Sequence, residues 1–192
     1  DGFVAVERPP PWCVDVSRLA RAAASLAAHG FPPGFLLAYE ASWRLQAQLA
    51  TVISTATGGN VATGDAIAFR VEPGASGFGP HRDRQPEDPA ATFRTPDNAP
   101  RSNVAWVALS RATPANGCMY VVPRERDPLF DNEADRTHKA PHLMPNFPHA
   151  HVRPLPASAG TVLMWHHNTI HWGSSCSPYA THPRKSIAMS FR

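Results

Sequence analysis

The sequence predicts a mainly β fold of the α+β class, an antiparallel β-sandwich or jelly roll with helices packed on one face. Two observations predict it. The first third of the 192 residues carries two stretches whose apolar residues recur at helical spacing, whereas from residue 65 onward short β-like runs alternate with turn signals. A content of 43% hydrophobic and 17% charged residues is enough for one sizeable core and argues against disorder.

Two helices are expected before residue 60. Over 16–29 apolar residues such as Leu19 and Leu26 recur at helical spacing. Asp15 or Ser17 can cap the start of this helix, and a Gly-Phe-Pro-Pro run follows its end. The second helix is indicated by an apolar stripe through Leu45, Leu49, Val52 and Ile53. Both helices are expected to pack against a sheet and to carry no chemistry.

Five short runs rich in β-branched and aromatic residues are predicted to be strands. They lie at residues 66–71, 103–109, 118–123, 160–166 and 185–191. Turn signals separate them, and no internal repeat is visible. This spacing is typical of an antiparallel sandwich or jelly roll.

The chain is expected to form one domain over residues 1–192, with a helical support region at 1–60 and a jelly-roll core at 61–192. Two connections, 84–102 and 124–150, are too long for ordinary turns and are rich in Pro, Asp, Asn, Arg and His. Loops of this length are lids, binding loops or plain surface excursions. We expect them to act as lid loops.

Composition excludes several classes of partner. The net charge is +3, and the 18 Lys and Arg are scattered among 15 Asp and Glu, so no nucleic-acid partner is expected. Three cysteines without a C-x-x-C pair indicate reduced thiols and a cytoplasmic location. No apolar run approaches the roughly 20 residues that span a bilayer, so no membrane partner is expected. Because the chain starts without Met, a removed leader stays open.

Histidines and one aspartate form a candidate metal site. In GPHRDRQ (79–85), His81 and Asp83 project to the same side if the chain is extended there. Three further histidines, His166, His167 and His171, follow the apolar run that begins at residue 160. Two histidines and a carboxylate are the facial triad that holds ferrous iron with open positions. A zinc-protease motif is excluded because no H-E-x-x-H glutamate is present, and any single histidine could instead be structural.

Arg184 precedes the last predicted strand, and Ser186 shares its parity. The two side chains would therefore face the same interior. A guanidinium binds a carboxylate through parallel N–H donors and keeps its charge. The sequence therefore favours a carboxylate-binding position at Arg184, with the hydroxyl of Ser186 beside it.

Four blocks occur in a characteristic order: HRD at 81–83, NVAWVALSRATPANGCMYVVP at 103–123, the segment from Gly160 to His171, and RKS at 184–186. The chain also begins with DGFVAV. This order resembles the phytanoyl-CoA dioxygenase family of iron(II)- and 2-oxoglutarate-dependent oxygenases, over nearly the whole chain. The block around Trp106 and Asn-Gly-Cys at 116–118 is the most specific part. After Pro123 the chain departs from the family, since RERD replaces a frequent Gly-Ser-His turn.

The resemblance implies a double-stranded β-helix, cupin-like, with Fe(II) and 2-oxoglutarate as cofactors and O2 as cosubstrate. It makes His81, Asp83 and His171 the iron ligands and the catalytic centre. Arg184 would bind the distal carboxylate of 2-oxoglutarate with help from Ser186. Two further positions, Trp106 and Ser174, would line the cosubstrate pocket, although Trp106 could equally be a core residue.

The resemblance also implies hydroxylation or a related oxidation of an unactivated C–H bond in a small molecule, with release of succinate and CO2. Halogenation is disfavoured because Asp83 stands where halogenating relatives carry a small residue. Arginines in or beside the long loops favour an anionic substrate, or are solvated surface residues; they are Arg82, Arg84, Arg94, Arg101, Arg124 and Arg126. The alternatives are a cupin-like metal enzyme that does not use 2-oxoglutarate and a ligand-binding β-domain. Oligomeric state cannot be read from the sequence.

Overall fold

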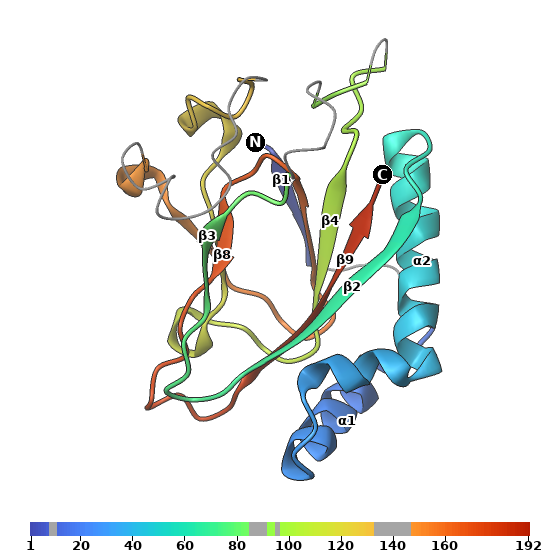
Figure 1. Cartoon of the computed structure of the whole chain (residues 1–192), viewed down its shortest axis with the longest axis vertical. Helices are drawn as coiled ribbons and strands as arrows, with labels where there is room; N and C mark the ends of the chain where they lie inside the picture. The colour runs from blue at the N-terminus through green and yellow to red at the C-terminus, as the bar shows by residue number, and fades with distance from the viewer. Residues whose placement is uncertain (8–10, 85–91, 95–96, 133–146) are drawn as a thin grey trace.

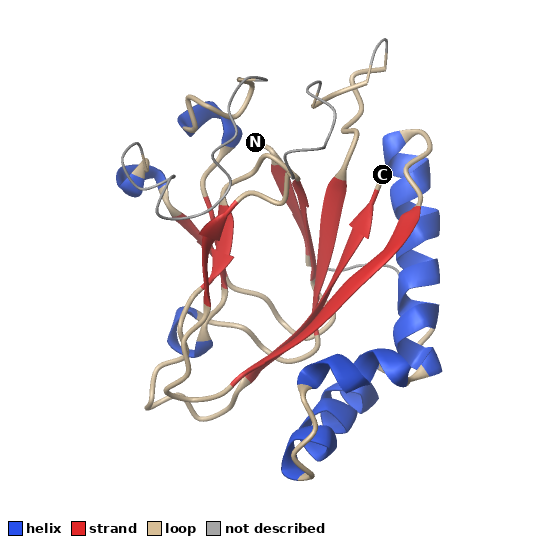
Figure 2. Ribbon diagram, in the orientation of Figure 1, coloured by secondary structure: helices blue, strands red, loops and turns tan. Residues whose placement is uncertain are grey.

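Two antiparallel sheets face each other in the computed structural model, which describes residues 1–7, 11–84, 92–94, 97–132 and 147–192 (Figures 1 and 2). The five-stranded sheet has the order β1-β7-β4-β9-β2, and the four-stranded sheet has the order β3-β8-β5-β6. The strands are β1 (Phe3–Val6), β2 (Ala62–Val71), β3 (Phe78–His81), β4 (Asn103–Ala108), β5 (Met119–Val121), β6 (Arg153–Leu155), β7 (Val162–His166), β8 (His171–Gly173) and β9 (Arg184–Phe191). This architecture confirms the predicted jelly-roll class.

Helices cover the outer face of the five-stranded sheet (Figure 1). The elements are α1 (Val16–Ala28), the short 3-10 helix η1 (Pro33–Ala38) and α2 (Glu40–Thr57). The carboxylate of Asp15 caps α1 by accepting a hydrogen bond from the backbone N–H of Arg18 at 3.1 Å. The buried face of α2 follows every fourth residue through Leu45, Leu49 and Ile53, so Val52 lies at its margin and is 45% exposed. No helix in the described ranges is long and apolar enough to cross a membrane.

Alternation along β4 divides the interior into two layers. Ala105 and Val107 pack toward the helices, whereas Val104 and Trp106 face the second sheet. Every residue of β4 is buried, because helices cover one face of this central strand and the four-stranded sheet lies opposite the other. The interior between the two sheets is where the predicted site residues meet.

The segment at residues 1–60, expected to be helical support, also contributes a strand. β1 is the edge strand beside β7, with Phe3 opposite Trp165. The carbonyl oxygen of Gly2 accepts hydrogen bonds from the backbone N–H of His166 at 2.9 Å and from the hydroxyl of Thr169 at 2.8 Å. The start of the chain therefore supports the turn that leads from β7 to β8.

All five predicted strands occur, each with slightly shifted bounds. The pattern missed four strands of three or four residues, β1, β3, β6 and β8. Such short strands carry too few residues for a two-residue alternation to stand out. Much of the two predicted lid loops, at 85–91, 95–96 and 133–146, lies outside the described residues.

Candidate metal centre and its cavity

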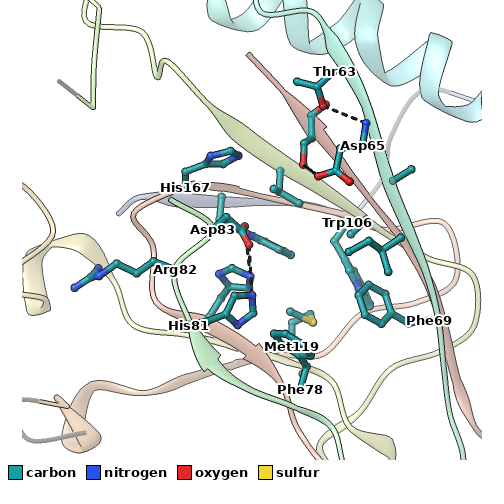
Figure 3. Close-up of a pocket in the computed structure, with 18 of the residues that line it drawn as sticks. Thr63, Asp65, Phe69, Phe78, His81, Arg82, Asp83, Trp106, Met119 and His167 are labelled. Atoms are coloured by element: carbon teal, nitrogen blue, oxygen red, sulfur yellow. Dashed lines mark hydrogen bonds and ion pairs between the residues drawn. The ribbon is translucent and has the colours of Figure 1, made fainter. Parts of the chain in front are cut away.

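The two short strands β3 and β8 bring the candidate ligands together. They pair antiparallel with His81 directly opposite His171, and Asp83 follows two residues after His81. Asp83 Oδ1 lies 3.4 Å from His81 Nε2, and Asp83 Oδ2 lies 3.5 Å from His171 Nε2. One ligand atom from each residue lies within 4.8 Å of the others, close enough for one ion to contact all three. Figure 3 shows His81 and Asp83 turned toward this common point.

Hydrogen bonds orient each of these side chains. Nδ1 of His81 lies 2.9 Å from the carbonyl oxygen of Gly79, and Nδ1 of His171 lies 3.0 Å from that of Thr169. Each Nδ1 can therefore carry the proton and donate it to a carbonyl, which leaves the Nε2 lone pair available for a metal. The indole N–H of Trp165 donates to Asp83 Oδ2 at 2.8 Å and fixes the carboxylate.

The protonation states also suit metal binding. Burial lowers the pKa of His171 to about 4, so its imidazole is neutral near pH 7. Burial alone would raise the pKa of Asp83, but the facing His171 and His81 outweigh this and hold it well below its ordinary value of 3.8. Two imidazoles and one carboxylate are the donor set of a non-haem iron(II) site with open positions.

A cavity of about 590 Å3 extends from these residues between the two sheets. Its walls are mainly apolar, with Phe69, Phe78, Trp106 and Met119 among the side chains shown in Figure 3. Arg184, at the start of β9, also lines it. The candidate ligands and this guanidinium therefore line the same cavity.

Arg184 is a buried cation that has no anionic partner among the described residues. Its residue is only 2% exposed, and no acidic side chain in the described ranges forms an ion pair with it. The guanidinium donates to the carbonyl oxygen of Gly117, while Nε has no hydrogen-bond partner. Burial lowers the pKa of Arg184 to about 10, so it stays charged at neutral pH. A buried charge of this kind is expected to be paired, which indicates an anion-binding position.

The family model of phytanoyl-CoA dioxygenase matches residues 13–176. The chain belongs to the phytanoyl-CoA dioxygenase family. By class it is therefore an iron- and 2-oxoglutarate-dependent dioxygenase, as the order of its sequence blocks implies. No curated protein matches the chain at a significant level.

Solved structures share the fold of this phytanoyl-CoA dioxygenase family member across its whole length. The epimerase SnoN from nogalamycin biosynthesis, in complex with Fe3+, alpha ketoglutarate and nogalamycin RO, is 21% identical, with a TM-score of 0.69 over 100% of this chain and 78% of SnoN. The carbocyclase SnoK from nogalamycin biosynthesis is 17% identical, with a TM-score of 0.68 over 99% of this chain and 79% of SnoK. EctD from S. alaskensis, with 2-oxoglutarate and 5-hydroxyectoine, is 18% identical, with a TM-score of 0.65 over 100% of this chain and 72% of EctD.

The other residues named from the sequence take different places in this dioxygenase. Trp106 is 1% exposed and lines the cavity. Ser186 is fully buried on β9 and its hydroxyl has no hydrogen-bond partner, but it is not among the cavity-lining residues. Ser174 is also absent from that lining. Roles for the two serines in cosubstrate binding stay predictions.

Of the two other histidines, His166 is structural. Its Nε2 lies 2.8 Å from the carbonyl oxygen of Thr92, and its ring stacks on Phe93 with centroids 4.8 Å apart. His167 lines the cavity. Sequence reasoning missed Trp165, which holds the carboxylate of Asp83 from 82 positions away. No local pattern could have found it.

Several of the arginines that suggested an anionic substrate serve the fold of the dioxygenase instead. Arg82 forms a buried ion pair with Asp127, and Arg124 pairs with Asp131 at 2.9 Å. Arg94 donates to the side chain of Asn60 at 3.1 Å. These contacts account for three of the six arginines without any substrate.

Gly173 leaves room for Arg184 in this site. A methyl group on Gly173 would overlap the guanidinium nitrogens of Arg184. We expect Gly173→Ala to displace the guanidinium and weaken 2-oxoglutarate binding about tenfold, or ~1.4 kcal/mol. The cost to stability should be small because the displaced group ends a flexible side chain. Titration of the Mn(II)-loaded protein with 2-oxoglutarate measures the effect.

A matched control is Gly34→Ala, because open space surrounds that glycine. It should bind 2-oxoglutarate as the parent protein does. Unchanged 2-oxoglutarate affinity in Gly173→Ala would show that the close approach of Gly173 and Arg184 does not matter for the cosubstrate.

Proposed function

We propose that the chain hydroxylates an unactivated C–H bond of a small molecule. The overall reaction converts substrate, O2 and 2-oxoglutarate into hydroxylated substrate, succinate and CO2. One observation carries the proposal: three candidate metal ligands line the same cavity as a buried guanidinium that forms no ion pair with any described residue. The three ligands would hold the iron to which the keto-acid end of 2-oxoglutarate binds, and Arg184 would bind its far carboxylate, which accounts for both features together.

Each residue has a distinct part in this proposal. His81, Asp83 and His171 hold the iron, and Trp165 keeps the carboxylate of Asp83 turned toward it. Arg184 binds the distal carboxylate of 2-oxoglutarate through its parallel N–H donors. When bound, the iron and 2-oxoglutarate supply the oxidising chemistry. The protein holds the substrate carbon beside the metal and excludes water, so no side-chain general base is needed.

The cavity also bears on the substrate. At one end the hydroxyl of Ser190 donates to Asp65 Oδ2 at 3.2 Å. The hydroxyl of Thr63 accepts a hydrogen bond from the backbone N–H of Asp65 at 3.2 Å (Figure 3). The walls between this end and the metal ligands are mainly apolar. We therefore favour a substrate with an apolar body and a hydrogen-bond donor that reaches Asp65. An anionic substrate stays a prediction, for which Arg101 and Arg126 are the exposed candidates without a side-chain partner in the described ranges.

All these parts are proposed to lie in one domain over residues 1–192, with helical support from 1–60 and the jelly-roll core at 61–192. Helix α2 contacts both β2 and β9, and β9 carries Arg184. The support region therefore backs the strand that would bind the cosubstrate.

Anaerobic titration with Fe(II) and then 2-oxoglutarate tests the proposal. We expect a weak visible charge-transfer band to grow to one equivalent of the keto acid, because chelation needs open positions on the metal. Glutarate, which lacks the keto group, should produce no band. A protein that binds Fe(II) but shows no band and no succinate formation would instead be the cupin-like enzyme or ligand-binding domain that does not use 2-oxoglutarate.

A further inference from the structure

Arg82 lies between two of the candidate ligands but faces the other way. Successive side chains of an extended chain point to opposite sides. Because the side chains of His81 and Asp83 point toward the candidate metal position, the side chain of Arg82 points the opposite way. Figure 3 shows its side chain directed away from both neighbours. It is nevertheless only 4% exposed, because it is inserted into the protein on that side.

The guanidinium of Arg82 forms a two-pronged ion pair with Asp127. Nη1 lies 2.5 Å from Asp127 Oδ2, and Nη2 donates to Asp127 Oδ1 at 3.0 Å. The two side chains are 4% and 2% exposed. This fork fixes direction as well as distance, which a single contact would not do. The ion pair therefore anchors residues 81–83 on the side opposite to the candidate metal ligands.

The same guanidinium also reaches the segment that leads to the third ligand. Arg82 Nη1 donates to the carbonyl oxygen of Asn168, which lies in the turn between β7 and His171. The side chain of Asn168 in turn donates to the carbonyl oxygen of Phe130 at 2.7 Å. One side chain thus links the segment of His81 and Asp83 to the segment of His171.

Asp127 is itself anchored. Its Oδ1 accepts the backbone N–H of Leu129 at 3.1 Å, and its carbonyl oxygen accepts that of Phe130 at 3.1 Å. A short turn therefore holds the carboxylate rigidly. The anchor is independent of the cavity, because neither Asp127 nor Leu129 lines it.

We propose that Arg82 and Asp127 form a positioning pair, which holds the three ligands in register before any metal arrives. The inference rests on the proposed function, since it assumes that His81, Asp83 and His171 bind the metal. A ligand set that is already arranged loses less freedom on binding, so loss of the pair raises the free-energy cost of metal binding. Residues that support metal ligands typically affect metal affinity about 10- to 100-fold.

Mn(II) alone is a suitable probe, because it needs neither O2 nor cosubstrate. We expect Arg82→Met to weaken Mn(II) binding about 10- to 100-fold in calorimetric titration. Arg82→Lys should lie in between, because it keeps the charge but loses the fork. The matched control is Arg153→Met, which breaks the 3.7 Å ion pair with Glu125, two residues before Asp127, from the edge strand β6. Its Mn(II) affinity should equal that of the parent protein.

A double variant separates positioning from folding. Removal of one partner leaves the other charge buried and unpaired, whereas replacement of both by apolar residues is often neutral for stability. Arg82→Met with Asp127→Leu should therefore recover thermal stability relative to the single variants, yet still bind Mn(II) weakly. Affinity equal to the parent in a folded Arg82→Met or double variant would overturn the inference.

The two proposals fail differently. His171→Ala serves as the reference for a broken metal site. Loss of Mn(II) binding in His171→Ala together with full binding in the Arg82 variants would refute the positioning pair alone. Equal Mn(II) binding by the parent and by His171→Ala would refute the metal site itself, and the positioning pair with it.

Discussion

His171→Ala is expected to abolish 2-oxoglutarate turnover and to weaken metal binding by more than about 100-fold. That exceeds the roughly 10- to 100-fold loss from residues that only support a ligand, because the substitution removes one of three donor atoms. The fold should survive. His171 pairs with His81 and Val121 through the backbone of β8, which alanine preserves. Metal content after reconstitution and succinate release on aeration measure the two effects.

The control for this variant is His166→Gln. His166 is another buried histidine, at the end of β7, but its Nε2 faces the carbonyl oxygen of Thr92 rather than the cavity. Replacement of His166 should lower the free energy of unfolding, but the metal content after reconstitution should stay at one ion per chain. Full succinate production by His171→Ala, or by the corresponding Asp83→Ala, would exclude these residues as ligands.

Arg184→Met is expected to raise the 2-oxoglutarate requirement about 100-fold or more. The breaking of a buried charge pair costs about 3–5 kcal/mol, and each 1.4 kcal/mol is about a factor of ten in affinity. Metal binding should be unchanged, since Arg184 is not among the grouped ligands. The concentration of 2-oxoglutarate at half-maximal succinate formation reports the loss, and Arg184→Lys should recover only part of it.

Arg184→Met lowers the affinity for 2-oxoglutarate, but it should not lower the stability of the cosubstrate-free protein. Without cosubstrate, the guanidinium of Arg184 in the parent protein is 2% exposed and has no ion-pair partner in the described part of the chain. Its removal should leave the cosubstrate-free protein at least as stable. Conversely, 2-oxoglutarate should raise the melting temperature of the Mn(II)-loaded parent but not of the variant. An unchanged 2-oxoglutarate requirement would assign the carboxylate to another residue.

The grouping of His81, Asp83 and His171 was predictable in part. A two-residue spacing on an extended chain places two side chains on one face whatever the rest of the fold does. The third ligand could not be chosen in the same way, because three histidines lie within residues 166–171 and only the pairing of β3 with β8 brings His171 opposite His81. The family resemblance pointed to His171, and the geometry groups the same residue with His81 and Asp83.

The supporting contacts could not be predicted from local pattern. Arg82 reaches Asp127 across 45 positions, and Trp165 reaches Asp83 across 82. Local residue spacing does not indicate either contact, because each contact depends on which strands become neighbours in the fold. Arginines near a candidate site therefore suggested an anionic substrate, although Arg82 and Arg124 face carboxylates of the chain itself.

The hydrogen bonds between Gly2 and the turn after β7 also affect how the protein folds. The chain contributes its first residues, its middle and its last quarter to one small region, because Gly2 contacts His166 and Thr169 while His81 pairs with His171. Such distant partners make folding slow relative to proteins built from local contacts. During translation residue 171 must leave the ribosome before the three candidate ligands can come together, so an emerging chain cannot complete this group of residues before that point.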